Sequence, residues 1–191
     1  MREYTVGYFV GSLAKESINR KLALALTHLA PEALTMREIA IANLPLYSYD
    51  YDPDYPPVAR ALKESIASTD AVLFVTPEYN RSIPGSLKNA IDWASRPYGR
   101  NSFARKPSAT IGASAGKIGT AVAQQHLKSI LSFCNSPQMN AIEAYIQFTP
   151  GLITDDGEVT NEATEEFLRN YMHEFHRFIE RVYTALTDDG S

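Results

Sequence analysis

The chain has 191 residues, of which 45% are hydrophobic and 21% charged, and its formal net charge is −4. This length and apolar content fit one globular domain spanning residues 1–191. The mildly acidic balance argues against a nucleic-acid-binding face, and the apolar runs are too short to cross a membrane. Cys134 is the single cysteine, which excludes an intrachain disulfide framework and a cysteine-rich metal site.

The N-terminal stretch MREYTVGYFVGS interleaves apolar and polar residues. A secretion signal would instead contain a continuous apolar block followed by small residues. We therefore expect a cytoplasmic protein that has neither nucleic acid nor membrane as a partner.

The first half of the chain alternates between strand-like and helix-like patterns. YTVGYFV is apolar, aromatic and β-branched, which is typical of a strand. The apolar residues that follow recur at helical spacing behind Ser17, which suits a helix cap. AVLFVT is apolar throughout, as expected for a strand buried on both faces. The elements predicted here are, in chain order, a strand at 4–10, a helix at 17–30, a strand at 34–41, a loop rich in Tyr, Asp and Pro at 44–57, a helix at 58–69 and a strand at 71–76.

The second half repeats this alternation. Pro84 suits the first turn of a helix, and the last long stretch carries apolar residues along one side of a helix. The elements predicted here are a helix at 85–95, a strand at 107–114, a helix at 117–134, a strand at 139–148 and a helix at 162–186.

Five strand–helix units in one chain of this length predict an α/β fold with a doubly wound parallel sheet. Ligands of such sheets bind beyond the carboxyl ends of the strands, where the strand order reverses. Three loops at strand ends have unusual compositions, and they cover residues 11–19, 76–83 and 112–119. We expect these loops to form the functional site.

The first loop, GSLAKESINR, joins a strand to a helix. The unpaired N–H groups of a helix N-terminus suit a phosphate, and Ser12, Ser17 and Asn19 add polar side chains. The loop has neither the Lys-Ser/Thr ending of a nucleoside triphosphate loop nor the G-x-G-x-x-G of a dinucleotide site. A bound monophosphate and an ordinary serine-capped helix both remain open on these residues alone.

The second loop, TPEYNRSIPG, has little conformational freedom because Pro77 and Pro84 bracket it. Such rigidity lowers the entropy lost when backbone groups meet a flat ligand. Tyr79 offers apolar surface and Asn80 an amide. The alternative is a purely structural turn. The third loop, GASAGKIG, contains small residues that allow a ligand or another backbone to approach closely.

In this order and spacing, GSLAKESINR, TPEYNRSIPGSLKNAIDWASRP and GASAGKIGTA resemble the NADPH-dependent FMN reductase family, which includes quinone, azo-dye and chromate reductases. The resemblance covers residues from about 4 to about 148, and the final helix is compatible with it. It implies a flavodoxin-like fold in which a five-stranded parallel sheet, in the order 2-1-3-4-5, carries helices on both faces.

The resemblance also implies roles for the first loop. Ser12, Ser17 and Asn19 would hold the FMN phosphate. The family usually has Arg where this chain has Ala14, and the neighbouring Lys15 would supply a point charge in its place, without the fork geometry of a guanidinium.

The other two loops would surround the flavin ring. The residues that would line the isoalloxazine and the ribityl chain, largely through backbone groups, are Pro77, Glu78, Tyr79 and Asn80. Ser114 and Gly116 would flank the ring from the third loop. Arg81 stands at a position that varies in the family, and it would face the nicotinamide substrate.

The implied activity is the transfer of hydride from NADPH or NADH to bound FMN and then to a quinone, azo compound or similar acceptor in a ping-pong cycle. Flavin chemistry needs no dedicated general acid or base, so we assign no catalytic side chain. The alternative is a non-enzymatic electron carrier like the flavodoxins. Those proteins have a phosphate loop rich in Thr and Gly and are more acidic, so the sequence favours the reductase.

The family resemblance further implies a homodimer or homotetramer. Trp93 lies on the predicted helix at 85–95, either on a face that needs a partner or in the core. His173 and His176 are interpreted as surface residues rather than metal ligands, and Cys134 as an inert buried thiol. The tyrosine-rich loop at 47–55 either is solvated or borders the acceptor site.

Overall fold

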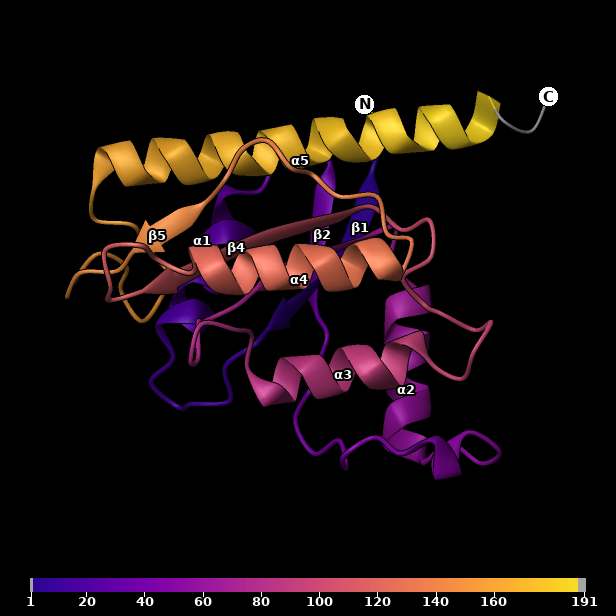
Figure 1. Ribbon diagram of the computed structural model, residues 1–191. Coiled ribbons are helices and arrows are strands. Elements are labelled where there is room, and N and C mark those ends of the chain that lie inside the picture. Colours follow the sequence, from indigo (N-terminus) through magenta and orange to yellow (C-terminus); the bar gives the residue numbers. More distant parts are fainter. Residues whose placement is uncertain (1, 189–191) are drawn as a thin grey trace.

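The computed structural model describes residues 2–188, in which strands and α-helices alternate along the chain (Figure 1). The strands are β1 (Tyr4–Val10), β2 (Leu34–Glu38), β3 (Ala71–Val75), β4 (Ser108–Ser114) and β5 (Tyr145–Gln147). The helices are α1 (Ile18–Leu29), α2 (Pro57–Ala67), α3 (Gly85–Ser95), α4 (Ala121–Phe133) and α5 (Glu162–Asp188), with a short 3-10 helix, η1, at Tyr49–Tyr51.

The five strands form one parallel sheet in the order β2-β1-β3-β4-β5. This confirms the predicted order. Because all the strands are parallel, their carboxyl ends share one edge of the sheet, at the left-hand end in Figure 1. The chain runs from β1 outward to β2 and then returns to β3 on the other side of β1, so the strand order reverses between β1 and β3.

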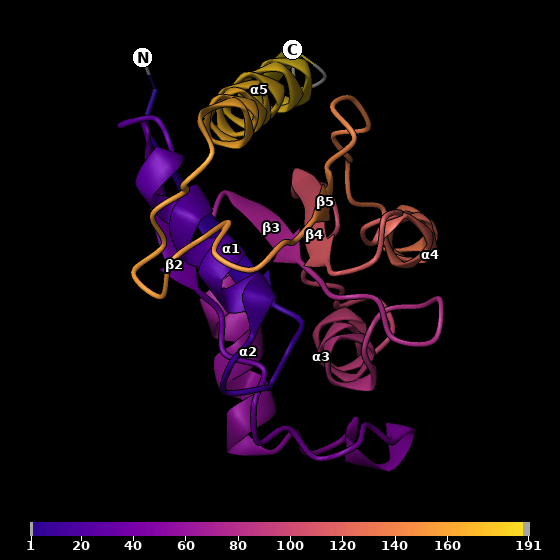
Figure 2. The ribbon, with the colours of Figure 1, turned by 90° about the vertical axis from the view of Figure 1, so that its left-hand side faces the viewer.

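Helices cover both faces of the sheet, with α5 and α3 on opposite sides (Figure 2). One apolar cluster joins α1 and α5 to the sheet, and the other joins α2, α3 and α4 to it. Alternate residues of β1 point into the two clusters, with Val10 in the first and Phe9 in the second. The Phe9 ring stacks on the ring of Phe74 of β3, and the two ring centroids lie 4.8 Å apart. β3 is buried along its whole length, as predicted.

Three predicted elements exceed the observed ones by three or more residues. The predicted strand at 139–148 is reduced to β5, because after the Met139 N–H bonds to the Ser108 carbonyl the chain leaves the ladder, and the Ala144 carbonyl bonds to a side chain of α4. The helix predicted from residue 117 begins at Ala121, since Gly119 takes a positive φ of 57°. The strand predicted to residue 41 ends at Glu38.

Trp93 is part of the core and is fully buried, so the interpretation that its helix face needs a partner is wrong. Its indole Nε1–H donates to the Pro45 carbonyl at 2.7 Å, and the rings of Tyr47 and Tyr55 pack edge-on against it. The tyrosine-rich loop is therefore partly a cover for Trp93, although Tyr49 remains 77% exposed.

His176 corrects another expectation, because it is buried against the ring of Tyr4 rather than on the surface. His173, one turn before it, is exposed as predicted. Within the part of the chain that the structure describes, no three His, Cys, Asp or Glu side chains are grouped so that they could hold a metal ion. Cys134 is buried as predicted, and burial raises the pKa of its thiol.

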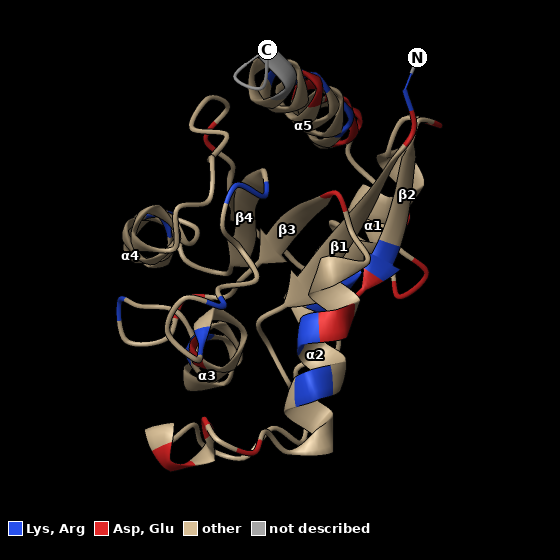
Figure 3. Ribbon diagram, turned by 90° about the vertical axis from the view of Figure 1, so that its right-hand side faces the viewer, with Lys and Arg blue, Asp and Glu red and all other residues tan. Residues whose placement is uncertain are grey.

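Acidic and basic residues are mixed along the helices and loops (Figure 3). Some of these charges form ion pairs between residues of the same helix: Lys88 pairs with Asp92 in α3, and Arg169 pairs with Glu165 in α5. None of the helices between residues 2 and 188 combines the length and the apolar character that a membrane crossing requires.

Candidate functional site

The first loop leads from β1 into the N-terminus of α1. Ser17 caps this helix, because its Oγ accepts the N–H of Arg20 at 3.3 Å. The N–H groups of Ile18 and Asn19 lie in the first turn, where a helix has no acceptors of its own. The Ser12 hydroxyl, which is nearly buried, accepts the N–H of Ala14. Hydroxyls and helix amides thus gather at one point, as anion binding requires.

The side chain of Asn19 connects two of the loops. Its amide nitrogen donates to the Ala113 carbonyl at 2.9 Å, and its amide oxygen accepts the Ala113 N–H at 2.9 Å. The side chain is buried, and both ends are committed to the end of β4. Asn19 therefore joins the first loop to the third, and it can offer a phosphate its backbone N–H.

The second loop contains a tight reversal after β3. Tyr79 and Ser82 exchange two backbone hydrogen bonds of 2.9 and 3.0 Å, and the residues between them, Asn80 and Arg81, have φ values of 51° and 63°. Two consecutive residues with positive φ are typical of a type I′ turn. Both prolines of the loop lie outside this turn, so the reversal depends on Asn80 and Arg81 instead.

The third loop approaches the second very closely. A Cβ atom on Gly112 would overlap the Thr76 carbonyl oxygen and the Thr120 hydroxyl. Gly112 is therefore required by the contact between β4 and the end of β3. Beyond it, the Ser114 hydroxyl accepts the N–H of Gly116 at 3.1 Å and stabilises the turn that leads toward α4.

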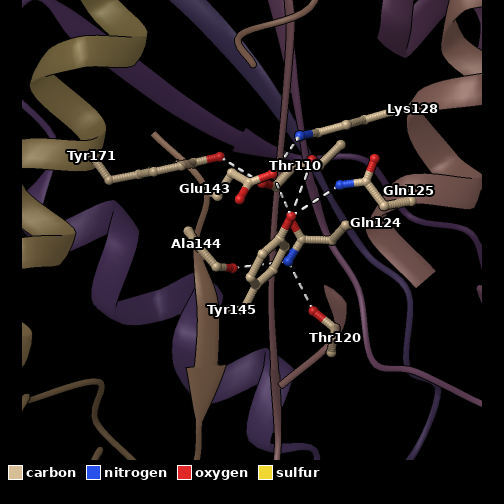
Figure 4. Close-up of polar contacts among 9 residues, drawn as sticks. All are labelled: Thr110, Thr120, Gln124, Gln125, Lys128, Glu143, Ala144, Tyr145 and Tyr171. Atoms are coloured by element: carbon tan, nitrogen blue, oxygen red, sulfur yellow. Dashed lines mark hydrogen bonds and ion pairs between the residues drawn. The ribbon is translucent and has the colours of Figure 1, made fainter. Parts of the chain in front are cut away.

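A buried polar network centred on Gln124 connects the elements on either side of the third loop (Figure 4). The Gln124 side chain on α4 donates to the Thr120 hydroxyl at 2.9 Å and to the Ala144 carbonyl at 2.8 Å. It also bonds to Thr110 on β4, and the Tyr171 hydroxyl of α5 donates to the carbonyl of the same threonine at 2.9 Å. These bonds fix β4 relative to the start of α4, and hence fix the loop between them.

The three loops border an open cleft with a volume of about 250 Å³. Of the predicted site residues, seven line it: Ser12, Ser17, Asn19, Pro77, Glu78, Tyr79 and Ser114. The other five lining residues are Ala14, Glu16, Ile18, Ala113 and Ala115, and of these only Ala14 stands out in the sequence, as the position where the family usually has Arg. Four of these five lack polar side chains, so composition gives no signal for them; apart from Ala14, only their positions beside the three loops could have indicated them.

Four predicted site residues lie outside the lining of this cleft. Lys15 borders a neighbouring hollow, together with Arg20 and Lys21, that shares Glu16 and Ser17 with the cleft. Asn80 and Arg81 form the exposed turn beyond Tyr79, and Gly116 is exposed beyond Ser114. Backbone, hydroxyl and alanine surfaces thus line most of the cleft, together with the carboxylate residues Glu16 and Glu78, whereas the basic residues Lys15 and Arg81 lie outside its lining.

Comparison with known proteins identifies relatives along most of the chain. A family model described as NADPH-dependent FMN reductase matches residues 4–150. A 2-hydroxy-1,4-benzoquinone reductase of a Burkholderia species is 46% identical over 174 residues, which cover 91% of this chain and 95% of the relative. A quinone reductase of Pseudomonas putida is 45% identical over 177 residues, with coverage of 92% and 95%.

A solved structure resembles the whole fold. FerB, a flavoenzyme NAD(P)H:(acceptor) oxidoreductase from Paracoccus denitrificans, superposes with a TM-score of 0.89 at 47% sequence identity, covering 93% of this chain and 98% of FerB. Sequence and structure therefore agree with the resemblance carried by the three loops, and the chain belongs to the NADPH-dependent FMN reductase family.

Proposed function

We propose that this protein is an FMN-dependent NAD(P)H oxidoreductase that reduces quinones, and that residues 1–191 form a single FMN-binding domain. The observation that carries the proposal is the convergence of three family-specific loops on one cleft at the carboxyl edge of the sheet, with a helix N-terminus at one end of it. The relatives named above, which are quinone reductases, support this acceptor class.

The residues of the cleft fit FMN. The Ser12 and Ser17 hydroxyls and the first amides of α1 would hold the phosphate. The backbone of Pro77, Glu78 and Tyr79 would lie along the flavin, opposite the small side chains that follow Gly112. Alanines on that side leave room for a flat ring. When bound, FMN supplies the two-electron redox chemistry, whereas the protein supplies position and environment.

The basic residues beside the cleft suit the nicotinamide donor. Lys15 and Arg81 lie outside the cleft lining, and the Arg81 side chain is 67% exposed. We place them near the phosphates of the donor. Because the cleft is open, the donor and the acceptor would use the same approach in turn, which accounts for a ping-pong cycle and for a broad acceptor range that includes azo compounds.

The experiment is reconstitution of the purified protein with FMN, followed by visible spectroscopy during anaerobic addition of NADPH or NADH and then a benzoquinone. If the protein is a reductase, the nicotinamide should bleach the flavin absorbance and the quinone should restore it. Steady-state rates at several fixed quinone concentrations should then give parallel lines in double-reciprocal plots, as a ping-pong cycle requires. Failure to bind FMN would exclude every flavin function. Bound flavin that neither nicotinamide can bleach would favour the electron carrier.

Assembly as a homodimer or homotetramer and a cytoplasmic location complete the proposal. The buried reduced thiol of Cys134 suits a reducing compartment. Large apolar side chains such as Leu46, Tyr98 and Phe133 are more than 80% exposed, which is compatible with subunit contacts. Light scattering coupled to gel filtration tests the assembly, and a monomeric mass at micromolar concentration would contradict it.

A further inference from the structure

Glu78 lies in the second loop, but its carboxylate is bonded to α4. Its Oε2 accepts the backbone N–H groups of Val122 and Ala123, each at 3.0 Å. These residues belong to the first turn of α4, where Thr120 occupies the cap position without a side-chain cap bond. A carboxylate at this place satisfies two helix amides and interacts favourably with the helix dipole.

The other carboxylate oxygen, Oε1, accepts from the Arg81 guanidinium at 3.0 Å. The Glu78 side chain is only 7% exposed, so this pair is anchored on a buried group. A second contact joins the same turn to α4, because His126 Nδ1 lies 3.2 Å from the Ser82 hydroxyl. The turn at residues 79–82 is therefore bound to α4 at two points.

These contacts connect parts of the site that are far apart in sequence. Glu78 follows β3, whereas Val122 and Ala123 follow the third loop, 44 and 45 residues later. With its oxygens bonded to Val122, Ala123 and Arg81, the Glu78 side chain is oriented toward protein groups rather than toward a ligand. Its backbone, by contrast, lines the cleft.

We propose that Glu78 is a positioning residue, whose carboxylate caps α4 and so holds the second and third loops at the spacing that the flavin ring requires. This inference rests on the proposed function. It assigns the side chain of Glu78 to the geometry of the site and only the backbone of Glu78 to cofactor contact.

The test compares FMN affinity and the visible spectrum of bound FMN in four variants of the full chain. Glu78→Ala deletes the cap, and its dissociation constant for FMN should rise roughly 3- to 30-fold. Glu78→Gln keeps an oxygen that can accept the α4 amides and should recover most of the affinity. Formate or acetate should fill the vacated space and partly restore binding in Glu78→Ala, with no effect on the unaltered protein.

Two further variants separate positioning from folding. Val122→Pro removes one donor N–H while Glu78 stays in place, and it breaks no intrahelical bond because the N–H groups of the first turn have no helical acceptor. Its FMN affinity should fall in the same direction as in Glu78→Ala. Glu165→Ala is the matched control, since Glu165 is an arginine-paired carboxylate in the first turn of α5. Its FMN affinity and flavin spectrum should match those of the unaltered protein.

The inference is overturned if Glu78→Ala and Val122→Pro bind FMN within twofold of the unaltered protein and with the same spectrum. If Glu78→Ala does not fold, an unchanged affinity in Val122→Pro suffices to reject it. Absence of FMN binding by the unaltered protein would instead reject the proposed function, so the two failures are distinguishable.

Discussion

Asn80 and Arg81 illustrate how single residues shape the site. Their positive φ values cost an L-residue about 1 kcal/mol or more relative to the right-handed region. Asparagine tolerates this conformation well, but arginine does not. The hydrogen bond from Arg81 to the buried Glu78 carboxylate offsets part of the cost. The strain is thus held in place by the contact that joins the turn to α4.

Gly112 gives a sharper prediction at the same scale. Gly112→Ala places a methyl group on the Thr76 carbonyl oxygen and the Thr120 hydroxyl, so β3 and β4 must separate. We expect a loss of about 1–3 kcal/mol in the free energy of unfolding, together with weaker FMN binding. Urea unfolding and FMN titration measure the two effects.

The matched control is Gly85→Ala at the start of α3, where an added Cβ meets no atom within 4 Å. This change should be neutral or slightly stabilising because it reduces the freedom of the unfolded chain. Equal stabilities of the two variants would contradict the close approach at Gly112.

At the scale of elements, Lys63 of α2 fastens the C-terminal end of α3. Its ammonium donates to the carbonyls of Ala94, Arg96 and Arg100 at 2.6–2.9 Å. These carbonyls belong to the end of a helix and the loop after it, where acceptors lack helical partners. α3 begins directly after the second loop, so the hydrogen bonds of Lys63 at the other end of α3 help to orient the helix that leads away from the site.

Lys63 also makes stability depend on pH. Burial, followed by the charge of Arg100, lowers its pKa to about 8 in the folded protein, whereas an unfolded chain titrates near 10.4. Between these values the unfolded state binds the proton and the folded state does not, so the contribution of Lys63 to stability rises with pH from about 8 to about 10.4 and is lost as pH falls through 8. In Lys63→Met this dependence should vanish.

Urea unfolding of the unaltered protein and of Lys63→Met at pH 7, 8, 9 and 10 measures this pH dependence of stability. The stability difference between the unaltered protein and Lys63→Met should grow over this range, and a constant difference would contradict the shifted pKa.

The network around Gln124 gives a prediction about the α4–β5 contact. Gln124→Leu leaves the buried Ala144 carbonyl and the Thr120 hydroxyl without their donor (Figure 4). We expect a loss of about 1–3 kcal/mol in unfolding free energy. Gln125→Leu alters the next residue, whose exposed amide bonds to the Tyr145 hydroxyl, and should stay within about 0.5 kcal/mol. Similar losses in both variants, measured by urea unfolding, would argue against a special role of the buried amide.

At the scale of the whole molecule, the sequence predicted a parallel sheet and the location of the site from local apolar patterns and strand-end loops, and it implied the strand order through the family resemblance of those loops. It did not predict the contacts between those loops. The side chain of Asn19, a residue predicted for the phosphate site, bonds to the backbone of Ala113, 94 residues away. The bond of Glu78 to α4 is equally non-local. Such pairings depend on tertiary proximity, which one sequence does not encode as a pattern.

FMN binding provides a test of the whole assembled site. A ligand that binds only the folded state at 100 times its dissociation constant adds about 2.7 kcal/mol of stability. For a chain of this size, that corresponds to a rise in melting temperature of roughly 5–10 °C.

Riboflavin has the same ring without the phosphate, so it should bind more weakly and raise the melting temperature less at equal concentration. Differential scanning calorimetry at several concentrations of each ligand measures both shifts. Equal shifts would mean that the Ser12–Ser17 end of the cleft does not hold the phosphate, whereas a larger shift with FMN would assign part of the binding energy to the N-terminus of α1.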